Sequence, residues 1–372
     1  MATHVVGIPA EVKADERRVA LTPDGVRELE AHGVDVLVEA GAGEGASIAD
    51  DAYAAAGAEL VDTAAEVWAR ADLVCKVKEP QAEELPRLRA EQTLFTYLHL
   101  AAYPDLARGL CHSGTTALAY ETVMREDGQL PLLAPMSEVA GRMAVQAGAR
   151  FLEAPQGGRG VLLGGAPGVQ PGRVVVIGAG NVGWNAAWIA AGMEAEVNLL
   201  DRNLDRLRVV DQIHKGRIST LASNRGTLER CIAEADLVIG AVLLAGGRAP
   251  VVVTEDMVRS MRPGSVIVDV AIDQGGCVAT ARETTHHDPT YVVHDVVHYC
   301  VGNIPGAVPA TSTHALTNAT LPYIVALAVH GTEEAIRLDP VLAAGLNVQG
   351  GALVHPAVAE ALGVAVGHAP PG

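Results

Sequence analysis

The amino-acid sequence predicts an α/β fold of two doubly wound domains joined by long helices, with a cleft between them. At 372 residues the chain is long enough for two domains, each with a sizeable core. Short β-branched runs alternate with helix-forming segments at the spacing of βαβ units. One of these strands is followed by a glycine-rich turn and a helix, at residues 173–192. We therefore expect two Rossmann-like domains, one at 1–131 together with 310–372 and the other at 132–309.

The first 130 residues contain the alternating elements of one domain. Thr22 is a typical N-cap residue and Pro23 suits a first helical position, so we expect a helix from there to about His32. Two short helices are expected at 50–58 and 63–71. Apolar runs predict a strand with its exit loop at 4–11, a strand with a glycine turn at 34–43, and strands at 72–80, 92–100 and 115–123.

Polar side chains lie near the expected ends of these strands. The strand at 72–80 is expected to end at Lys76 and Lys78, and the strand at 92–100 at His99, while Arg18 and Glu121 follow other strands. In open α/β sheets, ligands bind beyond the carboxyl ends of the strands. Because this half has no glycine-rich phosphate fingerprint, we interpret it as the candidate substrate domain.

The next stretch connects the two domains. Ser137 to Ala154 is rich in alanine at helical spacing, which predicts a long joining helix. Residues 157–172 are rich in glycine but also contain valine, leucine and proline. This mixture favours an ordered loop near a ligand or a subunit contact over a flexible linker.

The glycine-rich turn after residues 174–177 fits the dinucleotide-binding pattern G-x-G-x-x-G. In this pattern Gly178 permits the tight turn, Gly180 lets the backbone approach a pyrophosphate, and Gly183 lets helix and strand pack closely. The amides at the start of the helix then favour the phosphate charge. The alternative is an ordinary βαβ unit whose glycines serve only the turn.

An acidic residue follows the glycines at the expected distance. The next strand ends in Asp201, about 20 residues on, where a carboxylate accepts hydrogen bonds from the adenosine ribose. A carboxylate there repels a 2′-phosphate, so NAD is expected as the cofactor in preference to NADP. Arg202 directly follows and weakens this preference.

The remaining elements continue the same alternation. Helices are expected at 226–235 and 255–261. A long C-terminal helix is expected at 311–331, with Pro322 near its first turns or at a kink, and it is expected to return to the first domain. Strands are expected at 217–223, 236–243, 265–273 and 291–297.

Composition excludes several classes of protein. The net charge is −17 and no basic stripe is present, so nucleic acid is not expected as a partner. The five cysteines form no CxxC pair, which is typical of reduced thiols in a cytoplasmic protein. The N-terminus has no leader pattern and no run of 18 apolar residues occurs, so neither export nor a membrane span is expected. The thirteen histidines show no ligand spacing, and we expect no bound metal.

Four residues are candidates for chemistry on a small substrate. Arg18 and Lys78 suit a carboxylate, His99 suits general acid–base catalysis, and Asp273 would lie beside a bound nicotinamide. Taken singly, each also fits a structural role, as a surface cation, a hydrogen-bonded histidine or a turn-forming aspartate. G-x-S-x-G and Walker A motifs are both absent from the sequence, so neither nucleophilic hydrolysis nor a P-loop is supported.

The order and combination of motifs resemble those of bacterial NAD-dependent L-alanine dehydrogenases over nearly the full length. The matching stretches are ERRVALTP, KVKEP, FTYLHLA, PLLAPMSEVAGR, GGRGVLLGG, VVVIGAGNVG, LVIGAVL, VDVAIDQGGC and TSTHALTNATLPY. The resemblance implies reversible, NAD-dependent oxidative deamination of L-alanine to pyruvate and ammonium, with reduction of glyoxylate to glycine as a related activity. It also implies a cytoplasmic homohexamer.

The resemblance also implies roles for individual residues. Arg18 and Lys78 resemble the carboxylate-binding cations, with Met136 in the same substrate site. His99 resembles the catalytic acid or base, and Asp273 its partner in the water and ammonia steps. The nucleotide-contacting positions implied are Ser137, Gly178, Ala179, Gly180, Asn181, Val182, Gly183, Asp201, Arg206, Ser223, Val242, Leu243, Ile272, Asp273, Asn303 and Ile304.

Three alternatives remain at this stage. The nucleotide-binding subunit of proton-translocating transhydrogenase has a similar start, but Lys78, His99 and Asp273 together argue against it. Retention of the same groups argues against a catalytically silent NAD-sensing regulator. Another small amino acid, such as glycine or serine, stays open because one methylene changes binding by only about 1–3 kcal/mol. Two departures from the family pattern, Ile304 for methionine and Ala245 for proline, could alter the cofactor loop.

Overall fold

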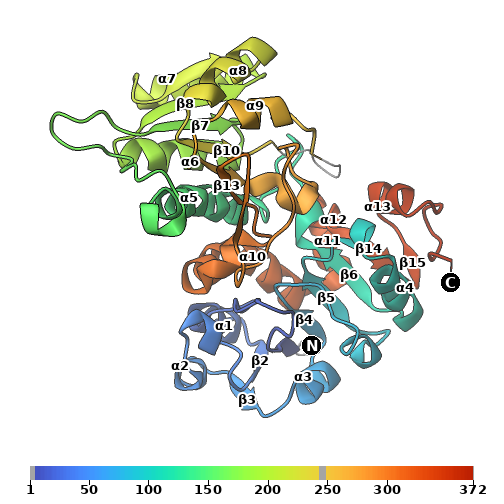
Figure 1. Cartoon of the computed structure of the whole chain (residues 1–372). Helices are drawn as coiled ribbons and strands as arrows, with labels where there is room; N and C mark the ends of the chain where they lie inside the picture. The colour runs from blue at the N-terminus through green and yellow to red at the C-terminus, as the bar shows by residue number, and fades with distance from the viewer. Residues whose placement is uncertain (1–4, 243–248, 372) are drawn as a thin grey trace. The chain divides into compact units, whose positions relative to one another are not determined.

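A computed structural model describes residues 5–242 and 249–371. The chain divides into two compact units, which we call the first unit (residues 1–136 and 308–372) and the second unit (residues 137–307). The sequence analysis places these boundaries at 131/132 and 309/310. Leu243 and Ala245, which the sequence analysis singled out, lie outside the described residues. Figure 1 labels the elements of both units.

The first unit is built on an eight-stranded sheet. Its strand order is β15-β14-β6-β5-β4-β1-β2-β3, in which β3-β2-β1-β4-β5-β6 is the parallel, doubly wound part. The antiparallel strand β14 pairs with β6, and β15 pairs with β14. The strands are β1 (Val5–Ile8), β2 (Asp35–Glu39), β3 (Glu59–Val61), β4 (Leu73–Cys75), β5 (Thr93–Thr96), β6 (Thr116–Ala119), β14 (Leu346–Gln349) and β15 (Ala352–Leu353).

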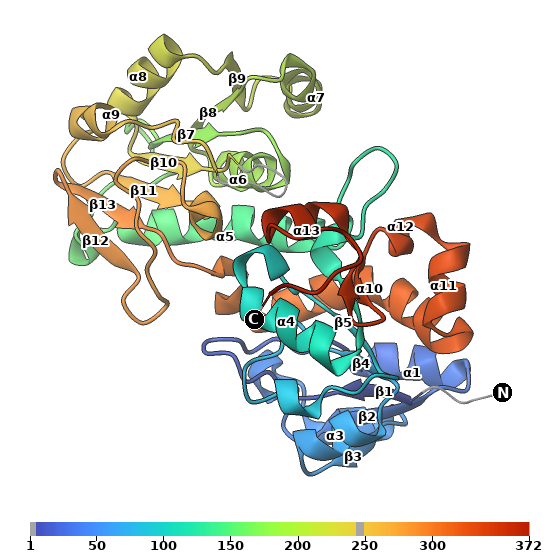
Figure 2. The ribbon, with the colours of Figure 1, turned by 90° about the vertical axis from the view of Figure 1, so that its right-hand side faces the viewer.

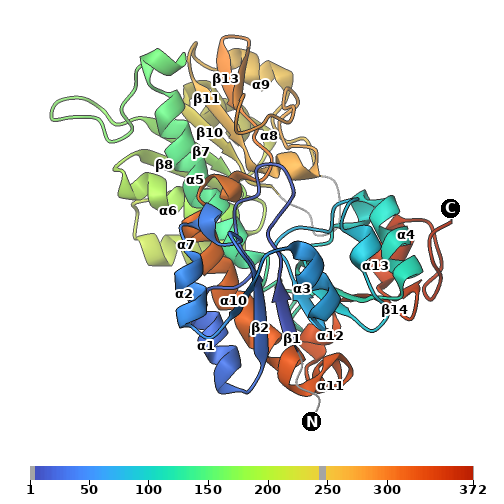
Figure 3. The ribbon, with the colours of Figure 1, turned by 90° about the horizontal axis from the view of Figure 1, so that it is seen from below.

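Helices cover both faces of this sheet, as a parallel sheet requires. Figure 3 shows β1 and β2 side by side, with α1 and α10 to one side and α3 to the other. The expected cap is confirmed, because the Thr22 hydroxyl accepts from the Gly25 N–H at the start of α1. The helices are α1 (Pro23–Ala31), α2 (Asp50–Ala55), α3 (Ala64–Arg70), α4 (Pro104–Ser113), α10 (Pro309–His330), α11 (Thr332–Leu338), α12 (Pro340–Ala343) and α13 (Pro356–Ala361).

Two long helices match the expected connections. Helix α5 (Ala134–Phe151) starts in the first unit and ends in the second, close to the expected 137–154. Helix α10 packs on α1 within the first unit, so the expected return of the C-terminal helix is confirmed. Pro322 lies well inside α10, not in its first turns. In the described part of the chain no helix combines the length and hydropathy needed to cross a membrane.

The second unit repeats the doubly wound order. Its strand order is β12-β13-β11-β10-β7-β8-β9, and β12 is the antiparallel edge strand. Figure 2 shows this sheet together with its helices. The strands are β7 (Arg173–Ile177), β8 (Glu196–Asp201), β9 (Ser219–Ala222), β10 (Leu237–Gly240), β11 (Val266–Asp269), β12 (Thr290–Val293) and β13 (Val296–Tyr299). The helices are α6 (Asn181–Gly192), α7 (Leu204–His214), α8 (Arg225–Glu234) and α9 (Glu255–Ser260).

The core of the second unit follows the period of its strands. Val174 and Val176 of β7 pack with residues of α5 and α6 on one face of the sheet. Val175 and Ile177 pack with residues of α8 and α9 on the other face. Because alternate residues of a strand point to opposite faces, a continuous β-branched run is what a doubly covered strand needs.

Two strand predictions for the second unit are wrong. The expected strand at 265–273 ends at Asp269, because the Asp269 carboxylate caps a 3₁₀ turn, η6 (Val270–Gln274), through the Ala271 N–H. The expected strand at 291–297 is a hairpin of β12 and β13. His294 and Asp295 form its turn with φ values of 53° and 60°, a conformation that histidine and aspartate tolerate better than most residues.

Two strands of the first unit end earlier than expected. Strand β4 ends at Cys75, so Lys76 and Lys78 lie in the loop that follows it. Strand β5 ends at Thr96, three residues before His99. The loop at 157–172 is tied by backbone bonds such as Gly172 N–H to Leu163 O at 2.9 Å. Its expected ligand or subunit contact stays a prediction.

Candidate active site

Arg18 is a buried cation with a fixed guanidinium. Its side chain is 2% exposed. The Glu16 carboxylate accepts from Nε at 2.7 Å and from Nη2 at 2.5 Å, while Nη1 contacts the Met136 sulfur at 2.9 Å. Burial opposes ionisation of Glu16, but its hydrogen bonds with Arg18 outweigh burial and lower its pKa to about 2. The pair therefore stays ionised, and Met136 lies directly beside it.

Lys78 lies in the loop after β4, close enough to Arg18 for their charges to interact. Burial lowers the pKa of the Lys78 ammonium, and the positive charge of Arg18 lowers it further, against the opposing effect of Glu16. The loop itself is fixed from two sides. Glu11 accepts from the Val77 N–H at 2.5 Å, and the Thr96 hydroxyl donates to the Lys78 carbonyl at 3.0 Å.

His99 completes the group of candidate substrate residues in the first unit. Its ring lies parallel to that of Tyr97, with 5.8 Å between the ring centroids. Burial raises the pKa of the Tyr97 hydroxyl, and the charges of Arg18 and Glu121 also act on it. Within the first unit, Arg18 thus lies near Lys78, Met136 and Tyr97, and Tyr97 stacks on His99.

The glycine-rich turn of the second unit has the expected local geometry. Gly178 adopts a φ of 107°, and a Cβ there would lie 2.5 Å from the Ala241 carbonyl oxygen. A Cβ on Gly183 would lie 1.7 Å from the Gly178 carbonyl oxygen, so only glycine lets α6 approach the turn. Gly180 is the N-cap of α6 and has no side chain to cap the first amides. These amides, including those of Asn181 and Val182, are arranged as in an anion site.

Asp201 lies directly beside this turn. Its carboxylate accepts from the Ala179 N–H at 2.6 Å and from the Asn203 N–H at 2.7 Å. The Arg206 guanidinium lies 3.9 Å from the same carboxylate. The Asp201 carbonyl accepts from Ser223, which places this residue at the same edge of the sheet. The described cofactor candidates from β7, β8 and β9 therefore meet at one place.

The last group of candidates follows β10, β11 and β13. Asp273 and Ile272 lie in η6, and the Asn303 N–H donates to the Asp273 carboxylate at 3.4 Å. Asn303 has a φ of 56° and precedes the buried Ile304. Val242 is the second residue after the end of β10. Ser137 lies in α5.

Several residues that support this site were missed by sequence reasoning. Glu16 fixes Arg18, Glu11 fixes the loop that carries Lys78, and Tyr97 stacks on His99. Asp269 accepts from the N–H groups of Ala271, Cys277 and Val278, which closes the loop that carries Asp273. The signal for Glu16 was available, since an acid two residues before an arginine can pair with it. The roles of Glu11, Tyr97 and Asp269 depend on contacts that form only when the chain folds.

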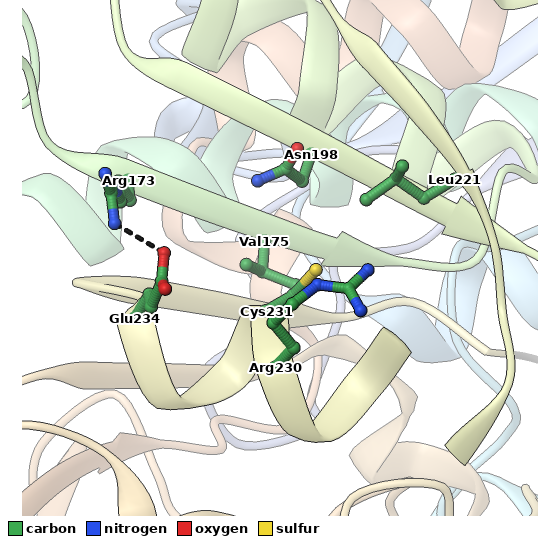
Figure 4. A pocket seen from close by; sticks show the side chains of 7 residues that line it. All are labelled: Arg173, Val175, Asn198, Leu221, Arg230, Cys231 and Glu234. Carbon is green, nitrogen blue, oxygen red and sulfur yellow. Dashed lines mark hydrogen bonds and ion pairs between the residues drawn. The ribbon is translucent and has the colours of Figure 1, made fainter. Parts of the chain in front are cut away.

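A separate cavity lies on the second unit, away from the glycine-rich turn. It has a volume of about 260 Å³ and its lining includes Arg173 at the start of β7, whereas the turn follows the end of that strand. Figure 4 shows the Arg173–Glu234 ion pair at one side of it, with Arg230 and Cys231 of α8 alongside. None of the predicted site residues lines it.

Comparisons with known proteins identify the family to which the chain is similar. The model of the alanine dehydrogenase/PNT N-terminal domain matches residues 7–140, and that of the C-terminal domain matches residues 144–356. Alanine dehydrogenases of Halomonas elongata and Mycobacterium tuberculosis are 58% and 57% identical, each over 96% of this chain and 97% of the relative. That of Bacillus subtilis is 54% identical over 96% of this chain and 95% of its own length.

Two solved structures are similar over most of the chain. An L-alanine dehydrogenase superposes with a TM-score of 0.94 at 52% identity, covering 96% of this chain and 99% of that one. A transhydrogenase from Sinorhizobium meliloti superposes with a TM-score of 0.82 at 27% identity, covering 95% of this chain and all of that one.

Proposed function

Because the chain belongs to the alanine dehydrogenase/PNT family, we propose that it catalyses the reversible, NAD-dependent oxidative deamination of L-alanine to pyruvate and ammonium. It is an amino-acid oxidoreductase with a nucleotide-binding domain. The observation that carries the proposal is the proximity of Arg18 and Lys78 in a chain 58% identical to an alanine dehydrogenase along nearly all its length. A cytoplasmic homohexamer is part of the same proposal and rests on the family resemblance.

In the proposed reaction, Arg18 and Lys78 bind the substrate carboxylate. Arg18 is fixed by Glu16 and Met136, so little side-chain freedom is lost when a carboxylate binds. Two cations close to each other repel, and an anionic substrate relieves this repulsion. Holding the carboxylate fixes the position of Cα, where the reaction takes place.

His99 and Asp273 are proposed to move protons during the reaction. Oxidation at Cα gives an imine, which must gain a water molecule and lose ammonia, with several proton transfers. An imidazole can both donate and accept a proton near neutral pH. We assign it this role, with the Asp273 carboxylate as its partner. Asp273 is held in place by η6 and by the Asn303 N–H.

The second unit fits a dinucleotide. The positions of Gly178 and Gly183 leave no room for a Cβ, and the start of α6 presents uncapped amides, as a pyrophosphate requires. Asp201 would accept hydrogen bonds from the adenosine ribose, which supports NAD as the cofactor. When bound, NAD supplies the acceptor for the electron pair of the Cα–H bond.

An assay with purified protein tests the proposal. We expect reduced nicotinamide to form with L-alanine and NAD, more slowly with glycine or serine, and more slowly with NADP. His99→Ala and Asp273→Ala should each lower kcat by at least about 10²-fold, since general acid–base catalysis contributes that much. Both variants should still bind NADH. Absence of turnover with every amino acid would contradict the function, and normal turnover in either variant would remove that residue from the mechanism.

A further inference from the structure

His99 holds a backbone conformation that few residues with a side chain adopt. Its φ and ψ are 49° and 39°, in the left-handed region, where the chain leaves β5 and enters the short turn η3 (Leu100–Ala102). A Cβ makes this region unfavourable, although histidine tolerates it better than most residues. Residues in such conformations persist only where their surroundings hold them.

The carboxylate of Glu121 contacts both the backbone and the ring of His99. Its Oε1 accepts from the His99 N–H at 2.5 Å, and both of its oxygens lie 3.2 Å from the Leu98 nitrogen. The same Oε1 lies 3.9 Å from Nδ1 of the imidazole. Hydrogen bonds to an ionised acceptor are about twice as strong as neutral ones. One side chain thus ties the left-handed turn and faces one nitrogen of the ring.

Glu121 is itself fixed by the C-terminal part of the first unit. It lies in the turn η4 (Tyr120–Thr122), directly after β6, the neighbour of β5. The next residue, Thr122, donates to the carbonyls of Ala119 and Gly345, and the buried Asn347 of β14 donates to its hydroxyl at 2.7 Å. The segment around β14 therefore holds η4 against the sheet.

The ring of His99 is supported on a second side by Tyr97. The two rings are stacked with an angle of 6° between their planes. The Tyr97 hydroxyl donates to the Leu132 carbonyl at 2.6 Å, which fixes the tyrosine. The imidazole therefore has a stacked ring against its face and a carboxylate near Nδ1, while its side chain remains 40% exposed.

We propose that Glu121 is a positioning residue for His99: it holds the left-handed backbone and directs Nδ1 toward its carboxylate, so that Nε2 is the nitrogen that exchanges protons with the substrate. This inference rests on the proposed function, in which His99 moves protons. A carboxylate that orients an imidazole through one nitrogen while the other does the chemistry is a general arrangement in acid–base catalysis. Glu121 acts through His99 and not on the substrate.

Kinetics of Glu121→Ala test the proposal. Because misplacing a catalytic group by about 1 Å costs about 10²-fold, kcat should fall by that factor, while KM for pyruvate and NADH affinity stay within about twofold. Glu121→Gln keeps the shape and one oxygen acceptor, so its loss should be smaller. Glu126→Gln, an exposed acid five residues further on, is the matched control and should leave kcat unchanged.

A double variant separates positioning from a general structural role. In a His99→Ala background, Glu121→Ala should cost no further activity, because its effect runs through a side chain that is gone. An equal loss in both backgrounds, or wild-type kcat in Glu121→Ala, would overturn the proposal. A wild-type protein without activity on alanine would instead contradict the proposed function.

Amide exchange supplies a readout that does not depend on activity. The N–H groups of Leu98 and His99 should exchange faster with deuterium in Glu121→Ala than in the wild type, with residues 173–183 as the internal reference. If Glu121→Ala does not fold, Glu121→Gln gives the same comparison with a weaker acceptor. Unchanged exchange at Leu98 and His99 in a folded variant would contradict the proposal.

Discussion

At the scale of single residues, the candidate site depends on acids as much as on cations. The chain carries many more acidic than basic residues, yet Arg18 and Lys78 lie together. Glu16 offsets part of their repulsion, and Glu11 fixes the loop of Lys78. The cations could be proposed from the sequence because their residue types suit a carboxylate. Glu121 was expected only as a polar group after a strand. Its contacts with Leu98 and His99, and that of Glu11 with Val77, could not be predicted because they join different parts of the chain.

The lowered pKa of Lys78 predicts how substrate binding depends on pH. Burial and Arg18 lower this pKa below 10.5, with Lys13 acting in the same direction and Glu16 and Glu79 opposing. The ammonium therefore loses its charge at a lower pH than a free lysine, and pyruvate should bind more weakly as the pH rises through that value. A charged hydrogen bond contributes about 1.5–3 kcal/mol, so the loss should be about ten- to hundredfold. The dissociation constant of pyruvate can be measured at each pH by titrating pyruvate into the enzyme–NADH complex and following the nicotinamide fluorescence.

Lys78→Arg is the matched variant, because arginine keeps its charge across the whole range. In this variant the dissociation constant of pyruvate should not rise as the pH passes the value at which Lys78 loses its charge in the wild type. The same rise in both proteins would assign it to another group.

Asp201 is expected to set the preference between NAD and NADP. Asp201→Ala removes a negative charge 3.9 Å from Arg206 and leaves that cation to attract a 2′-phosphate. We expect the ratio of kcat/KM for NAD to that for NADP to fall by at least about tenfold, since a change of about 1.4 kcal/mol corresponds to a factor of ten. Asp205→Ala, which changes an exposed acid in the first turn of α7, is the control. A ratio unchanged in Asp201→Ala counts against this role.

At the scale of elements, the sequence predicted strands and helices well where the pattern is continuous. The run from Val174 to Ile177 is buried on both faces, so its β-branched residues identified a central strand. Predictions failed where a single side chain or turn interrupts an apolar run. Asp269 ends β11 by capping η6, and His294 and Asp295 turn an apparent strand into a hairpin without glycine. The periodicity of apolar residues does not predict a side-chain cap or a tight turn of this kind.

Helix α6 offers a matched pair of glycines that tests the turn. Gly183→Ala places a methyl group 1.7 Å from the Gly178 carbonyl oxygen. Neither the Cβ nor the carbonyl can rotate away independently of the backbone, so α6 must shift. NADH affinity should fall by at least about 10²-fold, as expected when positioning errors reach about 1 Å. Gly192→Ala, at the other end of α6, meets no atom within 4 Å.

The Gly192→Ala control should bind NADH normally and be more stable by up to about 1 kcal/mol, because alanine favours helix. Titration of NADH fluorescence and thermal unfolding measure both effects. Similar NADH affinity in the two variants would show that the close approach at Gly183 does not matter for the cofactor.

At the scale of the whole molecule, two sheets with the same doubly wound order carry different candidate functional residues. The second unit has the glycine-rich turn and Asp201, whereas the first has two cations and an imidazole in the segments that follow its strands. The sequence predicted this division because only one strand ends in the glycine pattern. It did not predict β14, β15 and the short helices after α10, whose segments are too brief for a periodic signal. The segment around β14 also holds η4, and with it Glu121.

In the proposed reaction, the hydrogen on Cα of alanine leaves together with the electron pair of its bond, and the cofactor retains it. The most direct measurement is the mass of the reduced nicotinamide formed from L-alanine carrying deuterium at Cα, in ordinary water with NAD. We predict that each reduced cofactor contains one deuterium and that pyruvate forms in equal amount. Reduced cofactor without deuterium, or no reduced cofactor at all, would contradict the proposed reaction.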